Sequence, residues 1–229
     1  MTVAGGTTPA TRPSGAEPTA GLDLPARTVV RHLRIGLGRG EDPAADQDVL
    51  SIDERLRAVR FHHDDDRRRF VQTRIALRHL VGETLGLEPA AVAFTTVGRG
   101  RPVLSGPAAH SGLHVSASHA GEHGVVALCT QPIGVDVELV RPQAWDLDLA
   151  LRVLSPAELD YIAGAGDRDL AFFRCWTRKE AFVKTGHDGL TDRLRALTLT
   201  PGPNPAGFVV TDRVLEAGVH LACAHALSA

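Results

Sequence analysis

The sequence has few aromatic residues and few cysteines, and each scarcity limits the kinds of protein it can be. Aromatic residues make up 4% of its 229 positions, so the core must be packed from many small side chains, mostly Ala, Val and Leu. Its three cysteines, Cys129, Cys175 and Cys223, are odd in number and lack any CxxC spacing. Neither a disulfide framework nor a zinc knuckle is indicated, and we expect free thiols in a reducing compartment.

The net charge is small, and long apolar runs are absent. A formal net charge of -2 argues against a chain that coats nucleic acid or an anionic membrane by bulk charge. No segment approaches the roughly 18–20 apolar residues that span a bilayer, and the N-terminus lacks the basic start and apolar stretch of a secretory signal. We therefore expect a cytoplasmic protein without a nucleic-acid or membrane partner, in which local clusters bind any anion.

The length and the 43% content of hydrophobic residues are sufficient for one sizeable core or two adjoining ones. Residues 1–26 are rich in Gly, Pro, Thr and Ala, a composition that predicts a flexible tail. Alternating apolar residues predict a strand within 28–37, and helical spacing over 47–87 predicts two helices that separate near 63–66. Further short strands are predicted at 92–94, 113–116, 124–129 and 133–137, with a loop at 98–100 and a turn at 121–124.

The second half contains a strong helix start at Ser155-Pro-Ala-Glu158, with Ser as N-cap, Pro at the first helical position and Glu three residues past the cap. A longer helix is expected over about 167–184 and should end at Gly186. Short strands are predicted at 196–199, 207–211 and 219–224. Each half thus holds helices and a small sheet, although no clear internal repeat demonstrates a duplication.

A pair of acidic residues stands in the predicted strand Ile133-Gly-Val-Asp136-Val-Glu138. Residues two apart on a strand share a face, so the two carboxylates should project side by side. Neighbouring anions repel one another, and a hard divalent cation with oxygen ligands makes such an arrangement favourable. The alternative is a strand end whose acidic face is simply solvated, and the motif alone does not decide between the two.

A third carboxylate lies in the predicted long helix, where Trp176, Glu180 and Lys184 are four residues apart on one face. An ordinary Glu-to-Lys helix pair beside a core Trp is the alternative. If Glu180 joins Asp136 and Glu138, the three complete an oxygen-rich half-shell for magnesium, whose other positions are usually water and substrate phosphate. Together the motifs suggest phosphate-ester chemistry.

Anion binding is indicated by the segment Gly98-Arg-Gly-Arg-Pro102, which places two guanidinium groups in a glycine-lined loop. The segment 116–119 (Ser-Ala-Ser-His) adds a hydroxyl and an imidazole that can hydrogen-bond phosphate. There is no Gly-x-Ser-x-Gly elbow around Ser118, which disfavours a hydrolase nucleophile. An arginine-rich stretch over 55–69 is either a further anion site or a self-neutralising solvated face.

The order Gly-Arg-Pro-x-Leu, Ser-x-Ser-His, Gly-Val-Asp-Val-Glu and Trp-x-x-Lys-Glu-Ala-x-x-Lys closely resembles the 4′-phosphopantetheinyl transferase superfamily, in its surfactin-type (Sfp-type) branch. The resemblance runs from about Arg55 to Leu190, and the last two motifs are its specific part. There are two departures. Ser116 stands where the family commonly has Asn, and His187 replaces the first of two glycines expected after the last motif, whereas Gly189 keeps the second.

The resemblance implies an α+β fold of two similar subdomains in a pseudo-twofold arrangement, with coenzyme A and the active site in the cleft between them. After the tail, residues 27–132 would form an N-terminal subdomain with the nucleotide contacts, and 133–229 a C-terminal subdomain with the metal and catalytic residues. The length favours a monomer that carries both halves of the cleft.

The resemblance also assigns roles to single residues. Asp136, Glu138 and Glu180 would be the magnesium ligands, and Glu180, Lys184 and Asp136 the catalytic set, with Lys184 neutralising charge on the breaking pyrophosphate. The residues that would bind coenzyme A are Arg57, Arg69, Thr96, Gly98, Arg99, Gly100, Arg101, Pro102, Ser118, His119 and Lys184.

The implied reaction moves the 4′-phosphopantetheine arm of coenzyme A to a serine of an apo acyl or peptidyl carrier protein and releases 3′,5′-ADP. Whether Glu180 is the base that accepts the serine proton or only a metal ligand stays open. Two alternatives also stay open: a magnesium-dependent phosphohydrolase or nucleotidyl transferase, and a non-catalytic coenzyme A-binding module. The need for a carrier acceptor separates the transferase from both.

Overall fold

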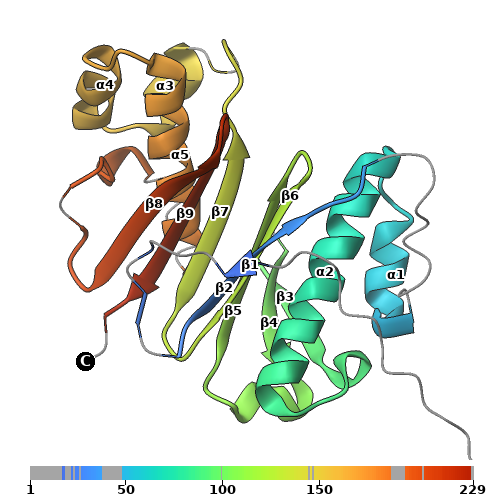
Figure 1. Cartoon of the computed structure of the whole chain (residues 1–229). Coiled ribbons are helices and arrows are strands. Elements are labelled where there is room, and N and C mark those ends of the chain that lie inside the picture. Colours follow the sequence, from blue (N-terminus) through green and yellow to red (C-terminus); the bar gives the residue numbers. More distant parts are fainter. Residues whose placement is uncertain are drawn as a thin grey trace, which may run out of the picture.

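Two antiparallel sheets, each packed against one long helix, organise the chain (Figure 1). The computed structural model describes residues 17–18, 22, 24–25, 27–37, 48–98, 100–143, 145, 147–186, 194–202 and 204–227. Within them the fold is α+β with two domains, and each domain combines helices with an antiparallel sheet, as the sequence predicts.

The first domain contains a four-stranded sheet of order β1-β2-β6-β5, on which helix α2 packs. Helix α1 begins at Ser51, whose side chain accepts a hydrogen bond from the Glu54 amide while the Glu54 carboxylate accepts from the Ser51 amide. A separate hairpin, β3-β4, lies beside the sheet. The elements are β1 (Glu17–Pro18), β2 (Val29–Arg34), α1 (Ile52–Ala58), α2 (Asp64–Leu85), η2 (Pro89–Ala91), β3 (Ala93–Val97), β4 (Arg101–Ser105), η3 (Gly106–His110), β5 (His114–Ala120) and β6 (His123–Cys129).

The second domain contains a three-stranded sheet of order β7-β9-β8, on which helix α5 packs. The predicted capping box at Ser155 and Glu158 is present at the start of α4. Helix α5 ends at its cap, Thr185, and the next residue, Gly186, has a φ of 121° that suits glycine. The elements are β7 (Ile133–Leu139), α3 (Leu147–Val153), α4 (Pro156–Ala163), α5 (Arg168–Lys184), β8 (Phe208–Glu216) and β9 (Val219–Ala226).

One predicted strand is wrong, five short elements were not predicted and one turn is shorter than expected. Residues 196–199 do not form a strand, because neighbouring side chains hold their backbone: Lys179 donates to the carbonyl of Leu197, and Glu158 accepts from the amide of Leu199. The elements that were missed are β1, η2, β4, η3 and α3, and β1 pairs with β2 from within the segment 1–26 that was predicted as a flexible tail. The turn between β5 and β6 is confined to 121–122, since His123 already begins β6.

The two sheets share a hydrophobic core. One face of β2 and β6 packs on the odd-numbered residues of β7 and on β9, and Cys129 and Cys223 lie in this shared core. All three cysteines are buried and free, as predicted. None of the helices in the described part of the chain is both long and apolar enough to cross a membrane.

Candidate active site

Strand β7 approaches helix α5 closely at Gly134. A Cβ atom added there would lie 1.9 Å from the carbonyl oxygen of Ala181, so a larger residue would push the strand away from the helix. The even-numbered residues of β7 therefore face α5, whereas its odd-numbered residues fill the shared core. This glycine explains how the acidic strand comes to lie against the end of the helix.

Asp136 is held by side chains from both domains. Lys184 Nζ of α5 donates to Asp136 Oδ1 at 2.6 Å, and Ser118 Oγ of β5 donates to the same oxygen at 2.7 Å. Lys184 Nζ also donates to Ser118 Oγ at 3.0 Å. The Asp136 side chain is only 5% exposed, which makes this a partly enclosed charged network where the domains meet.

Glu138 lies one step further along the same face of β7. Its Oε1 atom accepts a hydrogen bond from Trp176 Nε1 at 3.0 Å. The pKa of Glu138 is raised to about 7, chiefly by burial and then by the negative charges of Asp136 and, less strongly, Glu180, while the Trp176 bond and Lys184 oppose the rise. The three predicted carboxylates thus interact electrostatically, and the local cations compensate their charge only in part.

The residues fit a divalent cation chemically but do not form a finished cage. Asp136 Oδ2 is buried and has no hydrogen-bond partner, as expected of an oxygen that would coordinate a cation. Yet nowhere in the described ranges do three or more His, Cys, Asp or Glu side chains come together as a metal site. The assignment of Asp136, Glu138 and Glu180 as metal ligands stays a prediction.

A cavity of about 220 Å³ lies beside Lys184. Six of the residues predicted to bind coenzyme A line it, and they come from α1, the β3-β4 hairpin, β5 and α5: Arg57, Gly100, Pro102, Ser118, His119 and Lys184. Its other lining residues are Phe70, Thr73, Arg74 and Ala117. Residues far apart in the sequence thus converge on one cavity.

For Gly100 and His119 the structure explains why this type of residue occupies the position. Gly100 has a φ of 100°, and a Cβ there would lie 3.0 Å from Arg57 NH2, so only glycine allows the guanidinium to come this close. The pKa of His119 is lowered by burial and then by the charges of Lys184 and Arg69. Near neutral pH His119 therefore offers a neutral imidazole.

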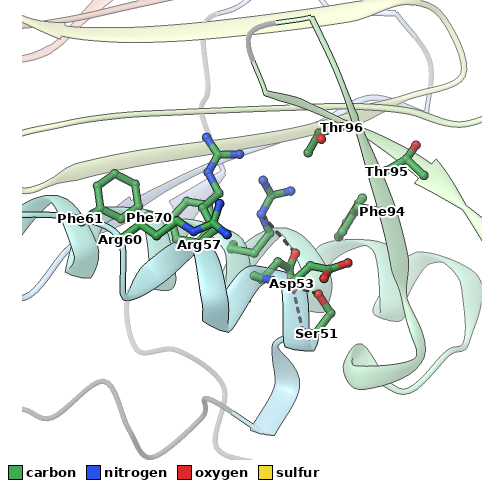
Figure 2. Close-up of a pocket in the computed structure, with 11 residues that line it drawn as sticks. Ser51, Asp53, Arg57, Arg60, Phe61, Phe70, Phe94, Thr95 and Thr96 are labelled. Atoms are coloured by element: carbon green, nitrogen blue, oxygen red, sulfur yellow. Dashed lines mark hydrogen bonds and ion pairs between the residues drawn. The ribbon is translucent and has the colours of Figure 1, made fainter.

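A larger cavity of about 820 Å³ adjoins the first, since Arg57, Phe70 and Arg74 line both. Arg57 and Arg60 lie on one side of it, and residues of β3, among them the predicted Thr96, on the other (Figure 2). Arg74 stands over the Phe70 and Phe94 rings and pairs with Glu54 at 3.3 Å. Burial lowers the pKa of Arg74 to about 10.

The other predicted contacts lie around these cavities. Arg69 Nε donates to the Gly121 carbonyl oxygen at 2.9 Å, and Arg69 NH1 pairs with Asp66 at 2.6 Å. Arg101 NH2 would be 3.9 Å from a Cβ on Gly186, near the end of α5. Gly98 occupies the β3-β4 turn with a φ of 55°. Three residues named from the sequence, Arg99, His187 and Gly189, lie outside the described residues.

Sequence reasoning missed several important residues. Arg74 was hidden among ordinary helical positions of α2. Lys179 forms a fully buried ion pair of 2.9 Å with Glu158. The capping box was a signal for Glu158, and Lys179 is the first lysine of the Trp-x-x-Lys-Glu-Ala-x-x-Lys motif, but neither pattern indicated that the two residues pair.

Comparison with known proteins agrees with this geometry. Residues 132–223 match the model of the 4′-phosphopantetheinyl transferase superfamily, and residues 43–131 match that of the N-terminal part of a 4′-phosphopantetheinyl transferase. The 4′-phosphopantetheinyl transferase HetI of Nostoc sp. is 40% identical over 167 residues, 69% of either chain. The 4′-phosphopantetheinyl transferase Sfp of Bacillus subtilis is 30% identical over 145 residues, 62% of either chain.

The chain belongs to the 4′-phosphopantetheinyl transferase superfamily, as its motifs predicted. Its activity is accordingly the transfer of the phosphopantetheine arm of coenzyme A to a carrier protein. The aligned part spans 69% of the Nostoc protein but less than two thirds of the Bacillus one.

Proposed function

We propose that coenzyme A binds where the two domains meet, with its nucleotide on the N-terminal domain and its pyrophosphate beside Asp136 and Lys184. The observation that carries the proposal is the network in which Ser118 and Lys184 both bond Asp136 Oδ1. It joins a strand of each domain to the helix of the second, next to a cavity lined by arginine, histidine and glycine.

Magnesium, when bound, would neutralise the pyrophosphate and polarise the phosphorus that is attacked. Asp136, Glu138 and Glu180 are the residues that would hold it. Two observations support this set: the buried Asp136 Oδ2 has no hydrogen-bond partner, and burial and the charge of Asp136 raise the pKa of Glu138, so a cation would stabilise its charged form.

Transfer begins when the hydroxyl oxygen of a carrier serine attacks the β-phosphorus of coenzyme A, the phosphorus that bears pantetheine. A P–O bond to serine forms, the P–O bond of the pyrophosphate breaks, and 3′,5′-ADP leaves. Lys184 stabilises the charge on the leaving phosphate, since its side chain is only 25% exposed and lines the cavity. Glu180 is the candidate base for the serine proton, in competition with its role as a metal ligand.

The proposed binding mode also divides the chain into two domains. We take 27–132 and 133–229 as the two halves and 1–26 as a tail, a boundary supported by the two family models, which meet between residues 131 and 132. A pseudo-twofold relation is supported by the presence in each half of a helix on an antiparallel sheet. We further propose a cytoplasmic monomer that modifies an apo acyl or peptidyl carrier protein.

The test is a mass measurement on an apo carrier incubated with the chain, coenzyme A and Mg²⁺. We expect the carrier to gain one phosphopantetheine and one 3′,5′-ADP to appear per carrier modified, with chelation of Mg²⁺ stopping both. Release of 3′,5′-ADP without a carrier would instead support the phosphohydrolase alternative. An Asp136→Asn variant is the control, because it keeps the shape of the side chain but loses its charge.

A further inference from the structure

The two domains meet along strands β5 and β7. β5 is the last strand of the first sheet and β7 the first strand of the second, and the two lie side by side (Figure 1). They belong to separate sheets, so no backbone ladder joins them. The relative position of the two strands must therefore be fixed by other contacts.

One such contact is a side chain of β5 that bonds the backbone of β7. Ser116 Oγ accepts a hydrogen bond from the Val135 amide at 3.0 Å. Both residues are buried, with exposures of 1% and 0%. On its other side Val135 pairs with Cys223 of β9, so its position is defined by one strand in each domain.

The neighbouring contact belongs to the candidate active site. Ser118, two residues further along the same face of β5, donates to Asp136, the residue that follows Val135. Two successive side chains of β5 thus hold two successive residues of β7. The first bond grips the backbone and the second the carboxylate.

We propose that Ser116 is a positioning residue that fixes β7 against β5 and so presents the Asp136 carboxylate to Ser118 and Lys184. This inference rests on the proposed role of Asp136 as a metal ligand. Ser116 touches no reacting atom and acts through the backbone of the residue beside Asp136.

A directional bond is needed here because the buried contact between the domains is largely apolar, and the ion pairs of Arg34 and His123 with Glu216 lie away from β5 and β7. The shared core is built from Val, Ala, Ile and Leu side chains together with two cysteines, and hydrophobic contact has no directional preference. A shift of β7 by one residue would turn Asp136 into that core and place Val135 or Val137 at the site. The Ser116 bond opposes such a shift, since buried backbone amides are rarely left without an acceptor.

The test compares three substitutions at one position. Ser116→Ala removes the acceptor, Ser116→Cys keeps nearly the same size with a poorer acceptor, and Ser116→Thr keeps the hydroxyl. Thr211→Val is the matched control, because the Thr211 hydroxyl is buried and has no hydrogen-bond partner, and its strand β8 is separated from β5 by β7 and β9. Each variant is assayed for kcat, for KM of coenzyme A and for the Mg²⁺ concentration that gives half-maximal rate.

A binding readout that does not need turnover comes from Trp176, which bonds Glu138. In a Trp145→Phe background Trp176 is the one tryptophan left, since the sequence has two. A fluorescence titration of the Trp145→Phe chain with Mg²⁺ then reports metal binding beside Asp136 directly.

We expect Ser116→Ala and Ser116→Cys to lower kcat by about tenfold, which corresponds to the roughly 1.4 kcal/mol of one buried hydrogen bond. Both variants should also raise the half-saturating Mg²⁺ concentration several-fold, in the rate assay and in the fluorescence titration. KM for coenzyme A should change by less than about threefold, and Ser116→Thr should restore most of the rate. Thr211→Val should behave like the parent chain.

A folded Ser116→Ala or Ser116→Cys variant with the kcat and Mg²⁺ dependence of the parent would overturn the inference, whatever its melting temperature. If Ser116→Ala does not fold, the Cys variant, which leaves no cavity, decides the question by the same criterion. A parent chain that transfers phosphopantetheine without Mg²⁺ would overturn the proposed metal site itself, a result that no Ser116 variant can imitate.

Discussion

Two lysines of helix α5, five residues apart, should respond in opposite ways when each is replaced by methionine. Lys179 is fully buried, pairs with Glu158 and donates to the carbonyls of Leu194 and Leu197. Lys184 is partly exposed and bonds Asp136 and Ser118 at the cavity. We expect Lys179→Met to cost stability and Lys184→Met to cost activity.

The expected losses of stability follow from how deeply each lysine is buried. Removing one partner of a buried ion pair typically costs about 3–5 kcal/mol, because the other charge is left uncompensated. Here Glu158 is 0% exposed, and two carbonyls lose their donor as well. Against a total stability of about 5–15 kcal/mol, Lys179→Met should lose at least about 3 kcal/mol. Lys184→Met should lose about 1–2 kcal/mol, since Ser118 still donates to Asp136.

Urea denaturation measures the first effect, and transfer rates of the folded variants measure the second. Lys184→Met should lower kcat about a hundredfold or more, in line with the loss of one preorganised charge contact to the leaving group. A Glu158→Gln/Lys179→Met double variant should regain part of the stability that the single one loses. If Lys184→Met were less stable than Lys179→Met, or if Lys179→Met unfolded at the urea concentration of the parent, the reasoning would be refuted.

Three further predictions concern the same region. Glu180→Gln should abolish transfer while the thermal melt stays near that of the parent, because the residue is only half-buried and its charge acts on Glu138. Gly134→Ala should lower both the melting temperature and the activity, since its Cβ would lie 1.9 Å from the Ala181 carbonyl oxygen, whereas Gly166→Ala, with nothing within 4 Å, should do neither. Burial, and then the charge of Arg34, lowers the pKa of His123. Below about pH 6.5 the unfolded chain therefore binds more protons than the folded chain. The free energy of unfolding should fall as the pH drops from 7.5 to 5.5.

Each of these has an outcome that contradicts it. A Glu180→Gln variant that melts far below the parent would make the residue structural. A Gly134→Ala chain as stable as Gly166→Ala would mean that β7 and α5 are not in tight contact. For His123 the comparison is with His123→Gln, whose unfolding should depend less on pH; an equal or steeper dependence would assign the effect to other groups.

The sequence indicated which residues lie near the candidate site better than it indicated which of them bond one another. Period-two spacing placed Asp136 and Glu138 on one face of a strand, and that face meets α5. Helical spacing placed Glu180 and Lys184 on one face of a helix, but it did not indicate that Lys184 pairs with Asp136. Spacing within one helix relates only neighbours on that helix, so it carries no information about a strand 48 residues away.

The missed and wrong elements have similar causes. The loop predicted at 98–100 was followed by no predicted strand because Pro102 argues against one, although proline is tolerated in a two-stranded hairpin such as β3-β4. The alternating Leu-Thr-Leu pattern at 197–199 is typical of a strand. The side chains of Lys179 and Glu158 bond that backbone instead, a long-range competition that local propensity cannot predict.

The most direct test of the proposed function is the mass of an apo carrier after incubation with coenzyme A, Mg²⁺ and either the parent chain or the Asp136→Ala variant. The affinity of each of the two chains for coenzyme A is measured alongside. We expect the parent to add one phosphopantetheine per carrier, and Asp136→Ala to add none while its affinity for coenzyme A stays within a few-fold of the parent value. Modification of the carrier by Asp136→Ala at the rate of the parent would contradict it.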